Sequence, residues 1–185
     1  MTSLAPAKNI LRGSIIGEDH AADLLKRLES GNCAATQIVI LDFSEVEAVT
    51  ASYLKKLLSP LLDSTTNGLK CGGIYPLVTC LSEDVREDLH SFLTEKGWLI
   101  SEIRLEGSRV AFCRLLGSPE PATTHTFNLL REKQPASAYT LHESSEDKNI
   151  TQTAWNNRLS TLLKLKLATR TKHGREWMYR TTFNQ

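Results

Sequence analysis

The segment Ile150-Thr151-Gln152-Thr153-Ala154-Trp155-Asn156-Asn157-Arg158-Leu159 predicts a helix, and its apolar periodicity continues to Leu165. Trp155, Leu159 and Leu162 recur at helical spacing and are expected to pack inward. The opposite side lacks the Glu and Lys mixture of an ordinary solvated helix and instead carries short neutral polar side chains: Gln152, Thr153, Asn156, Asn157 and Ser160. Because Asn and Gln can each form two hydrogen bonds with adenine, this face is typical of a helix in the major groove.

Two further helices and two strands flank this helix along the chain. Pro121 can occupy the first turn of a helix that runs to about Glu132, and a short helix follows over 137–142. After the helix over 150–165, strands are predicted over 167–171 and 176–183, around the turn Lys172-His173-Gly174-Arg175. Three helices followed by a strand, a turn and a strand form the winged helix-turn-helix arrangement, an α+β domain.

The charge of the chain is unevenly distributed. The whole chain has a net charge of +1, but the stretch from Lys148 to the end contains one acid, Glu176, and carries about +7. The part before it therefore carries about −6. The basic residues of the stretch from Lys148 to the end are Lys148, Arg158, Lys164, Lys166, Arg170, Lys172, Arg175 and Arg180. A basic end of this kind is expected of a protein that binds the phosphate backbone, with a solvated basic face as the alternative.

The segment 150–159 resembles the recognition helix of the ArsR and MarR-like winged-helix families. Leu167-Ala168-Thr169-Arg170 and Arg175-Glu176-Trp177-Met178-Tyr179 resemble the wing strands of the same families. The resemblance covers about 65 residues and implies that the helix 150–165 lies in the major groove, with the wing 167–183 on the backbone or minor groove. Two departures matter: Lys166 stands where those families often have Gly, and the short helix lacks the Cys and His set of the metal-sensing members, so no metal is implied.

The predicted nucleic-acid-binding residues follow from these patterns. The neutral side chains of the helix would contact bases, and the cations around it would contact phosphates. The full set is Thr151, Gln152, Thr153, Asn156, Asn157, Arg158, Arg170, Lys172, His173 and Arg175. Trp155 and Trp177 are expected in the core, and His173 is expected at the surface of the wing tip.

A domain boundary is predicted at Gly117-Ser118-Pro119-Glu120-Pro121, which breaks both helix and strand and separates a domain over 1–117 from one over 118–185. Ahead of it, helices and strands alternate, which predicts an α/β domain with a small mixed sheet. Ser82 is a predicted helix N-cap and Gly97 a predicted helix end. Pro76 is expected to confine the strand 74–78 to a sheet edge or a bulge.

The segments Leu41-Asp42-Phe43-Ser44-Glu45-Val46 and Val49-Thr50-Ala51-Ser52-Tyr53-Leu54 resemble a STAS-type domain, in which a strand ends in a motif such as Asp-Phe-Ser shortly before a helix. The resemblance implies a STAS-like fold that dimerises or receives a signal. Anti-anti-sigma factors of this fold carry a serine at the helix start that a partner kinase phosphorylates, and Ser52 holds that position here. The usual acidic and small neighbours are replaced by Thr50 and Tyr53, and an ordinary N-cap formed by Thr50 or Ser52 is the alternative.

The sequence argues against several other functional classes. No P-loop, G-x-S-x-G or H-E-x-x-H motif occurs, so no catalytic residue, metal ligand or cofactor is predicted, and the chain is not expected to be an enzyme. The segment 1–8 lacks the apolar core of a signal peptide, and no apolar run reaches membrane-span length. Three of the four cysteines lie in strand-like apolar surroundings and are expected to be reduced core residues of a cytoplasmic protein; the four are Cys33, Cys71, Cys80 and Cys113.

These patterns lead to a cytoplasmic transcriptional regulator that binds double-stranded DNA as a homodimer, because two half-sites multiply the limited affinity of one recognition helix. The alternative is a protein-interaction switch or adaptor, in which the STAS-like domain docks a kinase or other ATPase and the winged helix mediates assembly contacts. A third hypothesis, binding of RNA or single strands, needs exposed aromatic platforms, and the Trp and Tyr residues fall at core-like positions.

Overall fold

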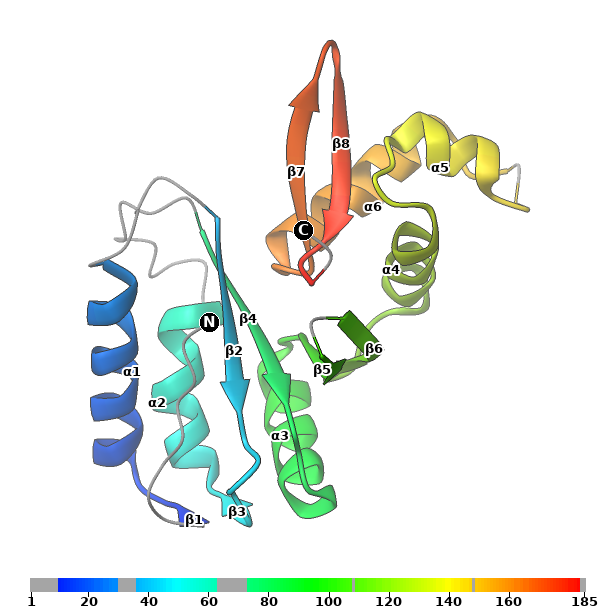
Figure 1. Cartoon of the computed structure of the whole chain (residues 1–185). Helices are drawn as coiled ribbons and strands as arrows, with labels where there is room; N and C mark the ends of the chain where they lie inside the picture. The colour runs from blue at the N-terminus through cyan, green and yellow to red at the C-terminus, as the bar shows by residue number, and fades with distance from the viewer. Residues whose placement is uncertain (1–9, 30–35, 63–72, 108, 148, 184–185) are drawn as a thin grey trace. The chain divides into compact units, whose positions relative to one another are not determined.

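The structure is a computed structural model that describes residues 10–29, 36–62, 73–107, 109–147 and 149–183 (Figure 1). The chain is mixed α/β and divides into two compact units, Met1–Ser118 and Pro119–Gln185. Unit 1 contains a helix–strand alternation, and its elements are β1 (Ile10–Leu11), α1 (Ser14–Glu29), β2 (Gln37–Asp42), β3 (Ala48–Val49), α2 (Ala51–Leu62), β4 (Ile74–Thr79), α3 (Glu83–Lys96), β5 (Ile100–Glu106) and β6 (Arg109–Leu116).

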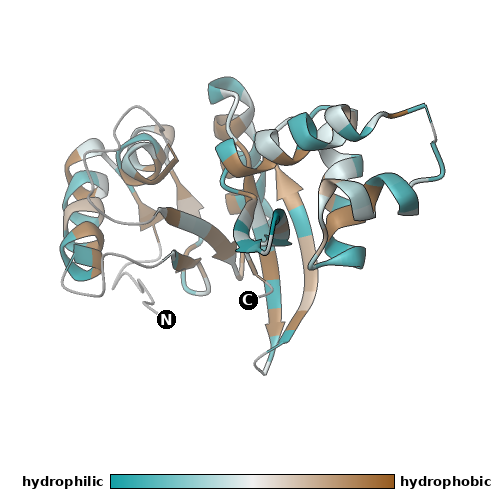
Figure 2. Cartoon of the chain, turned by 90° about the horizontal axis from the view of Figure 1, so that it is seen from above, coloured by the Kyte–Doolittle hydropathy of each residue, from teal (hydrophilic) through white to brown (hydrophobic). Residues whose placement is uncertain are grey.

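The sheet of unit 1 is small and mixed, as predicted. Its strand order is β2-β4-β5-β6, with β2, β4 and β5 parallel and β6 antiparallel to β5; β1 and β3 form a separate two-stranded parallel pair. Figure 2 shows the sheet strands mostly in the hydrophobic colour, while the helices alternate between the two colours. Apolar side chains of the helices and of one sheet face form the core, including Leu24, Leu54, Leu58, Val78, Leu89 and Ile100.

The expectation that Pro76 confines its strand to an edge is wrong. β4 is an interior strand, between β2 and β5. The hydrogen bonds from Gln37 N to Gly73 O and from Phe43 N to Thr79 O show that the odd-numbered residues of β4 face β2. The nitrogen of Pro76 therefore points to the β5 side, where pairing begins only at Leu77. Because β5 does not pair with β4 at Pro76, the missing N–H removes no hydrogen bond between the two strands. An interior strand can therefore contain this proline.

The predicted ends of α3 are confirmed. The hydroxyl of Ser82 accepts a hydrogen bond from Val85 N at 3.4 Å, which is the geometry of an N-cap. Gly97 ends the helix in the left-handed conformation with φ of 64°, which a glycine adopts without a steric cost.

The expectation that three of the four cysteines lie in the core is wrong. Cys80 is exposed and Cys113 is half-buried, so neither lies in the core. Cys80 follows β4 with a positive φ of 57°, so the chain has already turned out of the sheet at that point. Cys33 and Cys71 lie outside the described residues.

Unit 2 contains the predicted order of three helices and two strands: α4 (Pro121–Lys133), α5 (Ala138–Ser144), α6 (Gln152–Lys164), β7 (Ala168–His173) and β8 (Glu176–Thr181). Its core includes Phe127, Leu130, Leu141, Trp155 and Leu159, all at most 1% exposed. β7 and β8 form an antiparallel hairpin that extends from the helices (Figure 1). β7 reaches His173, which pairs with Glu176, so the turn itself is only Gly174 and Arg175.

No helix among the described residues is both long and apolar enough to cross a membrane.

Candidate nucleic-acid interface

Helix α6 has one buried side and one exposed polar side. Trp155, Leu159 and Leu162 are fully buried, which confirms the predicted inward face. The opposite face is open to solvent along the first two turns, where the exposed side chains are Gln152, Thr153, Asn156 and Asn157, with Ser160 half-buried. A helix with this division can lie against a ligand surface without giving up its packing in the core.

The start of α6 is fixed by a side-chain cap. Thr151 is the N-cap, and its hydroxyl accepts a hydrogen bond from Ala154 N at 3.2 Å. The turn before it is also tied, because the carbonyl of Ile150 lies 2.9 Å from His142 Nδ1 on α5. The helix predicted over 150–165 thus begins two residues later. Thr151 positions the exposed face and, being exposed itself, remains available for contact.

The end of α6 shows how a lysine, instead of a glycine, is accommodated at position 166. This residue has a positive φ of 58°, the left-handed conformation that glycine adopts most readily. Lys166 N donates to Leu163 O, and Leu167 N donates to Leu162 O at 2.9 Å, which closes the helix and directs the chain into β7. Lys166 therefore takes the backbone conformation of a helix-ending glycine, and the turn from α6 into β7 forms without a glycine.

The hairpin is anchored to the helices at its base. Ala136, between α4 and α5, forms a two-way backbone bridge with Tyr179 of β8, at 3.0 and 2.9 Å. Beyond this base most side chains are exposed, including the predicted contacts Arg170, Lys172, His173 and Arg175, while Met178 is half-buried. The cations of the hairpin are therefore accessible to a ligand, while the backbone at the hairpin base is fixed against the helices.

The expectation that Trp177 lies in the core is wrong. Its side chain is 41% exposed, whereas Trp155 is fully buried as predicted. The Arg170 guanidinium lies 4.2 Å from the centre of the Trp177 ring, and Lys172 Nζ lies 6.0 Å from it. Trp177 is one residue from the first position of β8, so it lies beyond the part of the hairpin that packs on helices. The closeness of Trp177 to the hairpin turn was the signal in the sequence that could have predicted its exposure.

The exposed charges of the hairpin are mainly positive, with Glu176 beside Arg175 as an acidic neighbour. Within the described parts of unit 2, no carboxylate lies within ion-pair distance of Arg158, Arg170, Lys172 or Arg175. Arg158 is half-buried, with its guanidinium 5.2 Å from the centre of the Trp155 ring. Uncompensated cations of this kind attract phosphate, and their attraction weakens as salt rises.

In unit 1, the candidate phosphorylation site Ser52 is exposed in the first turn of α2. Thr50, and not Ser52, caps the helix: its hydroxyl accepts from Tyr53 N at 3.4 Å and from Gly13 N at 3.3 Å. Ser52 Oγ lies 3.1 Å from the same hydroxyl. The predicted turn after β2 is confirmed, because Asp42 accepts a hydrogen bond from Ser44 N at 2.9 Å.

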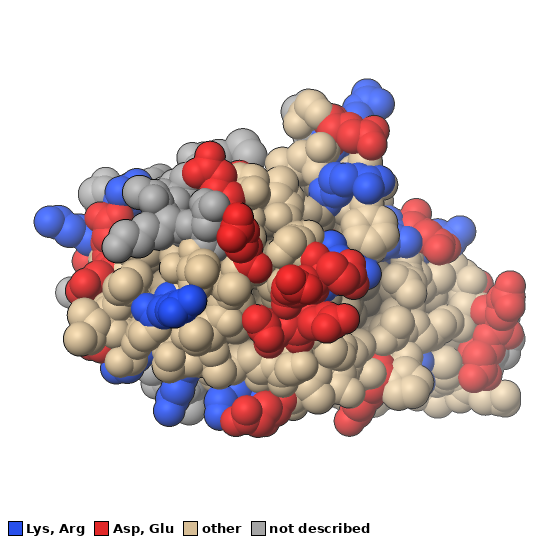
Figure 3. Space-filling model, turned by 90° about the horizontal axis from the view of Figure 1, so that it is seen from below, with Lys and Arg blue, Asp and Glu red and all other residues tan. Residues whose placement is uncertain are grey.

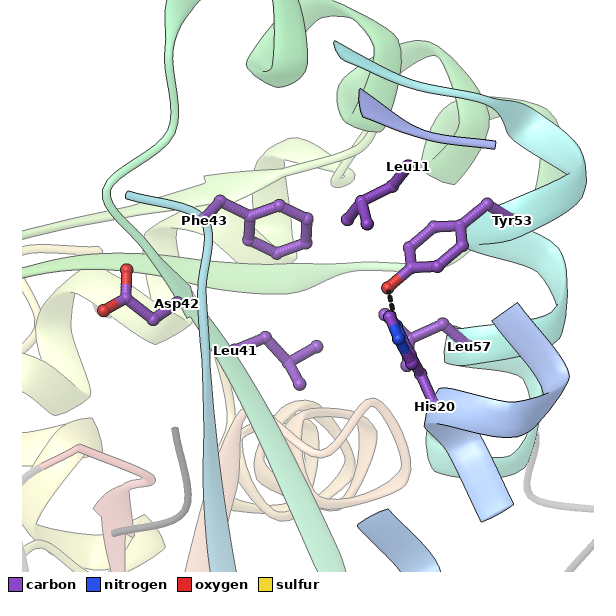
Figure 4. Close-up of a pocket in the computed structure, with 7 residues that line it drawn as sticks. All are labelled: Leu11, His20, Leu41, Asp42, Phe43, Tyr53 and Leu57. Carbon is purple, nitrogen blue, oxygen red and sulfur yellow. Dashed lines mark hydrogen bonds between the residues drawn. The ribbon is translucent and has the colours of Figure 1, made fainter. Parts of the chain in front are cut away.

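A small hollow near this helix start is lined mainly by apolar side chains (Figure 4). His20 Nδ1 and the Tyr53 hydroxyl meet across it at 2.9 Å. Its free volume of about 10 Å³ accommodates at most one water molecule. Burial raises the pKa of Tyr53 to about 12, so the phenol stays protonated over the physiological range. A hollow of this size cannot hold a small-molecule substrate.

The acidic residues of α3 form a solvated face. Acidic side chains gather on the face of the molecule shown in Figure 3, and Glu83, Asp84, Glu87 and Asp88 are all exposed. Glu102 of β5 is buried beneath α3, where Arg86 and Arg114 pair with it. The hydrogen bond with Glu102 is the main cause that raises the pKa of Arg86. In the ranges that the structure describes, no three His, Cys, Asp or Glu side chains group closely enough to hold a metal ion.

Comparison with known proteins found no matching protein-family model, no matching curated protein and no matching solved structure.

Proposed function

We propose that this chain is a DNA-binding transcriptional regulator whose unit 2 binds double-stranded DNA as a winged helix-turn-helix. The observation that carries the proposal is the juxtaposition, in one small unit, of an exposed neutral polar helix face and unpaired cations on the adjoining hairpin. In this proposal α6 lies in the major groove, and the β7–β8 hairpin is the wing on the backbone or minor groove.

The helix face is suited to base contacts. Asn156 and Asn157 are adjacent, exposed and free of charge, and each amide offers a donor and an acceptor to a base edge. Gln152 and Thr153 extend this face toward the capped start of the helix. An ordinary solvated helix gains little from such residues, because Asn and Thr are weaker helix formers than Glu or Lys.

The cations supply the attraction that is independent of sequence. Arg170, Lys172 and Arg175 have exposed side chains, and Arg158 lies next to the polar face of α6. Each phosphate that they neutralise releases counterions, so the affinity should depend steeply on salt. In the same proposal, unit 1 is a STAS-like domain of a cytoplasmic homodimer, which provides dimerisation or signal input.

The experiment is fluorescence anisotropy of the full chain with a labelled duplex of random sequence, on the order of two helical turns long. Titrations at salt concentrations from about 50 to 300 mM give the slope of log Kd against log salt. The proposal expects binding that weakens steeply with salt. Absence of binding at the lowest salt contradicts it.

The second candidate is a protein-interaction switch, and the exposure of Ser52 favours it. A phosphate on Ser52 would lie in the first turn of α2, next to the positive end of the helix dipole, and would add charge to a docking surface. Mass spectrometry of the protein purified from its own cells distinguishes the two candidates. Phosphate on Ser52 together with a stoichiometric ATPase partner and no DNA supports the switch.

A further inference from the structure

Trp177 is an exposed aromatic side chain of unit 2 that lies outside the polar helix face. The strand register places Trp177 directly opposite Lys172 and diagonal to Arg170, so the three side chains share one face of the hairpin. Nearer the base, the same face carries Ala168, Tyr179 and Thr181, which are at most 4% exposed because they pack in the unit. Trp177 lies on this face just beyond the packed base, where the side chains become exposed to solvent.

The surroundings of Trp177 indicate what could cover it. An indole that is 41% exposed leaves apolar surface in water, which a ligand with a flat apolar surface can cover. Two cations lie near the ring, at 4.2 Å for Arg170 and 6.0 Å for Lys172, and no acidic side chain described in this unit pairs with either. A ligand that combines a flat π surface with negative charge, as a nucleotide does, matches both the ring and the cations.

We infer that Trp177, with Arg170 and Lys172, is a platform on which an unpaired nucleobase stacks. Base stacking on an aromatic ring does not require a particular sequence, and the adjacent cations can contact the phosphates on either side of the base. A base inside an intact duplex has both faces covered by its neighbours, so the platform selects a base at a single-stranded overhang. This inference rests on the proposed function in one respect: the duplex part of the ligand is bound by α6.

The proposed ligand is therefore duplex DNA that continues into a single strand, bound by α6 on the duplex and by Trp177 on the first unpaired bases. Binding of a single strand requires an exposed aromatic side chain, and Trp177 provides one. A protein partner for this surface is the competing occupant, and it predicts no effect of unpaired bases on DNA binding.

The test compares three labelled DNAs by anisotropy with the full chain at low salt: a blunt duplex, the same duplex with an overhang of about five thymines, and the single strand alone. The variants are Trp177→Ala, which removes the ring, and Trp177→Phe, which keeps a smaller one. Tyr139→Ala is the matched control, because Tyr139 is 53% exposed on α5 and has no cation over its ring in the described structure. Urea unfolding of each variant confirms that it is folded.

The inference expects the overhang to tighten binding of the wild-type chain about tenfold over the blunt duplex. Trp177→Ala should lose this gain, Trp177→Phe should keep part of it, and Tyr139→Ala should keep all of it. An equal affinity of the wild-type chain for blunt and overhang DNA overturns the inference, as does an undiminished gain in Trp177→Ala. Failure of the blunt duplex to bind, with Trp177-dependent binding of the single strand, overturns the duplex function and leaves the platform standing.

Discussion

The side-chain oxygen of Gln134 accepts two hydrogen bonds from Thr181, one from the backbone N–H at 2.7 Å and one from the hydroxyl at 2.8 Å. Gln134 follows the last turn of α4, and Thr181 is the last residue of β8. Thr181 is fully buried, so neither donor can turn to water. This pair, with the backbone bridge between Ala136 and Tyr179, holds the base of the hairpin against the helices.

Replacement of Gln134 with Ala should therefore destabilise unit 2. Two buried donors of Thr181 would lose their acceptor, which costs about 1–3 kcal/mol for each group left unsatisfied. Urea unfolding followed by the fluorescence of Trp155 measures the change, and the exposed Gln152→Ala is the matched control. An unchanged unfolding midpoint in Gln134→Ala would show that the pair does not stabilise the unit.

The double variant Asn156→Ala with Asn157→Ala should reduce sequence preference more than non-specific binding. Each amide that pairs with a base supplies about 1–3 kcal/mol of discrimination, while phosphate contacts are unaffected. Selection of duplexes from a random pool, compared with affinity for random DNA, measures the two effects separately. Asn128→Ala is the control, because Asn128 is exposed on α4. Full retention of specificity in the double variant would show that another surface contacts the bases.

The double variant Lys172→Ala with Arg175→Ala should weaken binding to all duplexes alike. If each cation neutralises one phosphate, the slope of log affinity against log salt should become shallower by about 0.9 per residue removed. The control removes two exposed lysines of unit 1, Lys26→Ala with Lys55→Ala, and changes net charge by the same amount. Equal effects of the two pairs would mean that overall charge, and not the hairpin, governs affinity.

The stability of unit 1 should depend on the ionisation of Tyr53. The pKa of the buried phenol is about 12, against about 10 for an exposed one, so above pH 10 the unfolded chain loses its proton first. Stability from this group is fully present below pH 10 and is lost as the pH rises toward 12. At pH 11 the loss should be about 1 kcal/mol.

Tyr53→Phe removes this ionisation and is the reference for the pH dependence. The difference in unfolding free energy between the wild-type chain and Tyr53→Phe should shrink or change sign between pH 8 and pH 11. The same difference at both pH values would mean that Tyr53 ionises equally in the folded and unfolded chain.

The sequence predicted the features that depend on local periodicity and capping. Three such features depend on neighbours in sequence and are all present: the core face of α6, the ends of α3 at Ser82 and Gly97, and the β5–β6 hairpin. Pro76 was misjudged because its outcome depends on where β5 begins to pair, which is a long-range feature. Trp177 was misjudged because composition suggests that a tryptophan is buried, while its position near the hairpin turn leaves nothing to bury it against.

Amide NMR of the ¹⁵N-labelled full chain, titrated with a short random duplex, would show directly whether the exposed face of α6 and the β7–β8 hairpin bind DNA. The shifted or broadened signals should cluster in residues 151–158 and 170–177, including the side-chain amides of Gln152, Asn156 and Asn157. Signals that move only in unit 1, or that do not move at all, would contradict this prediction.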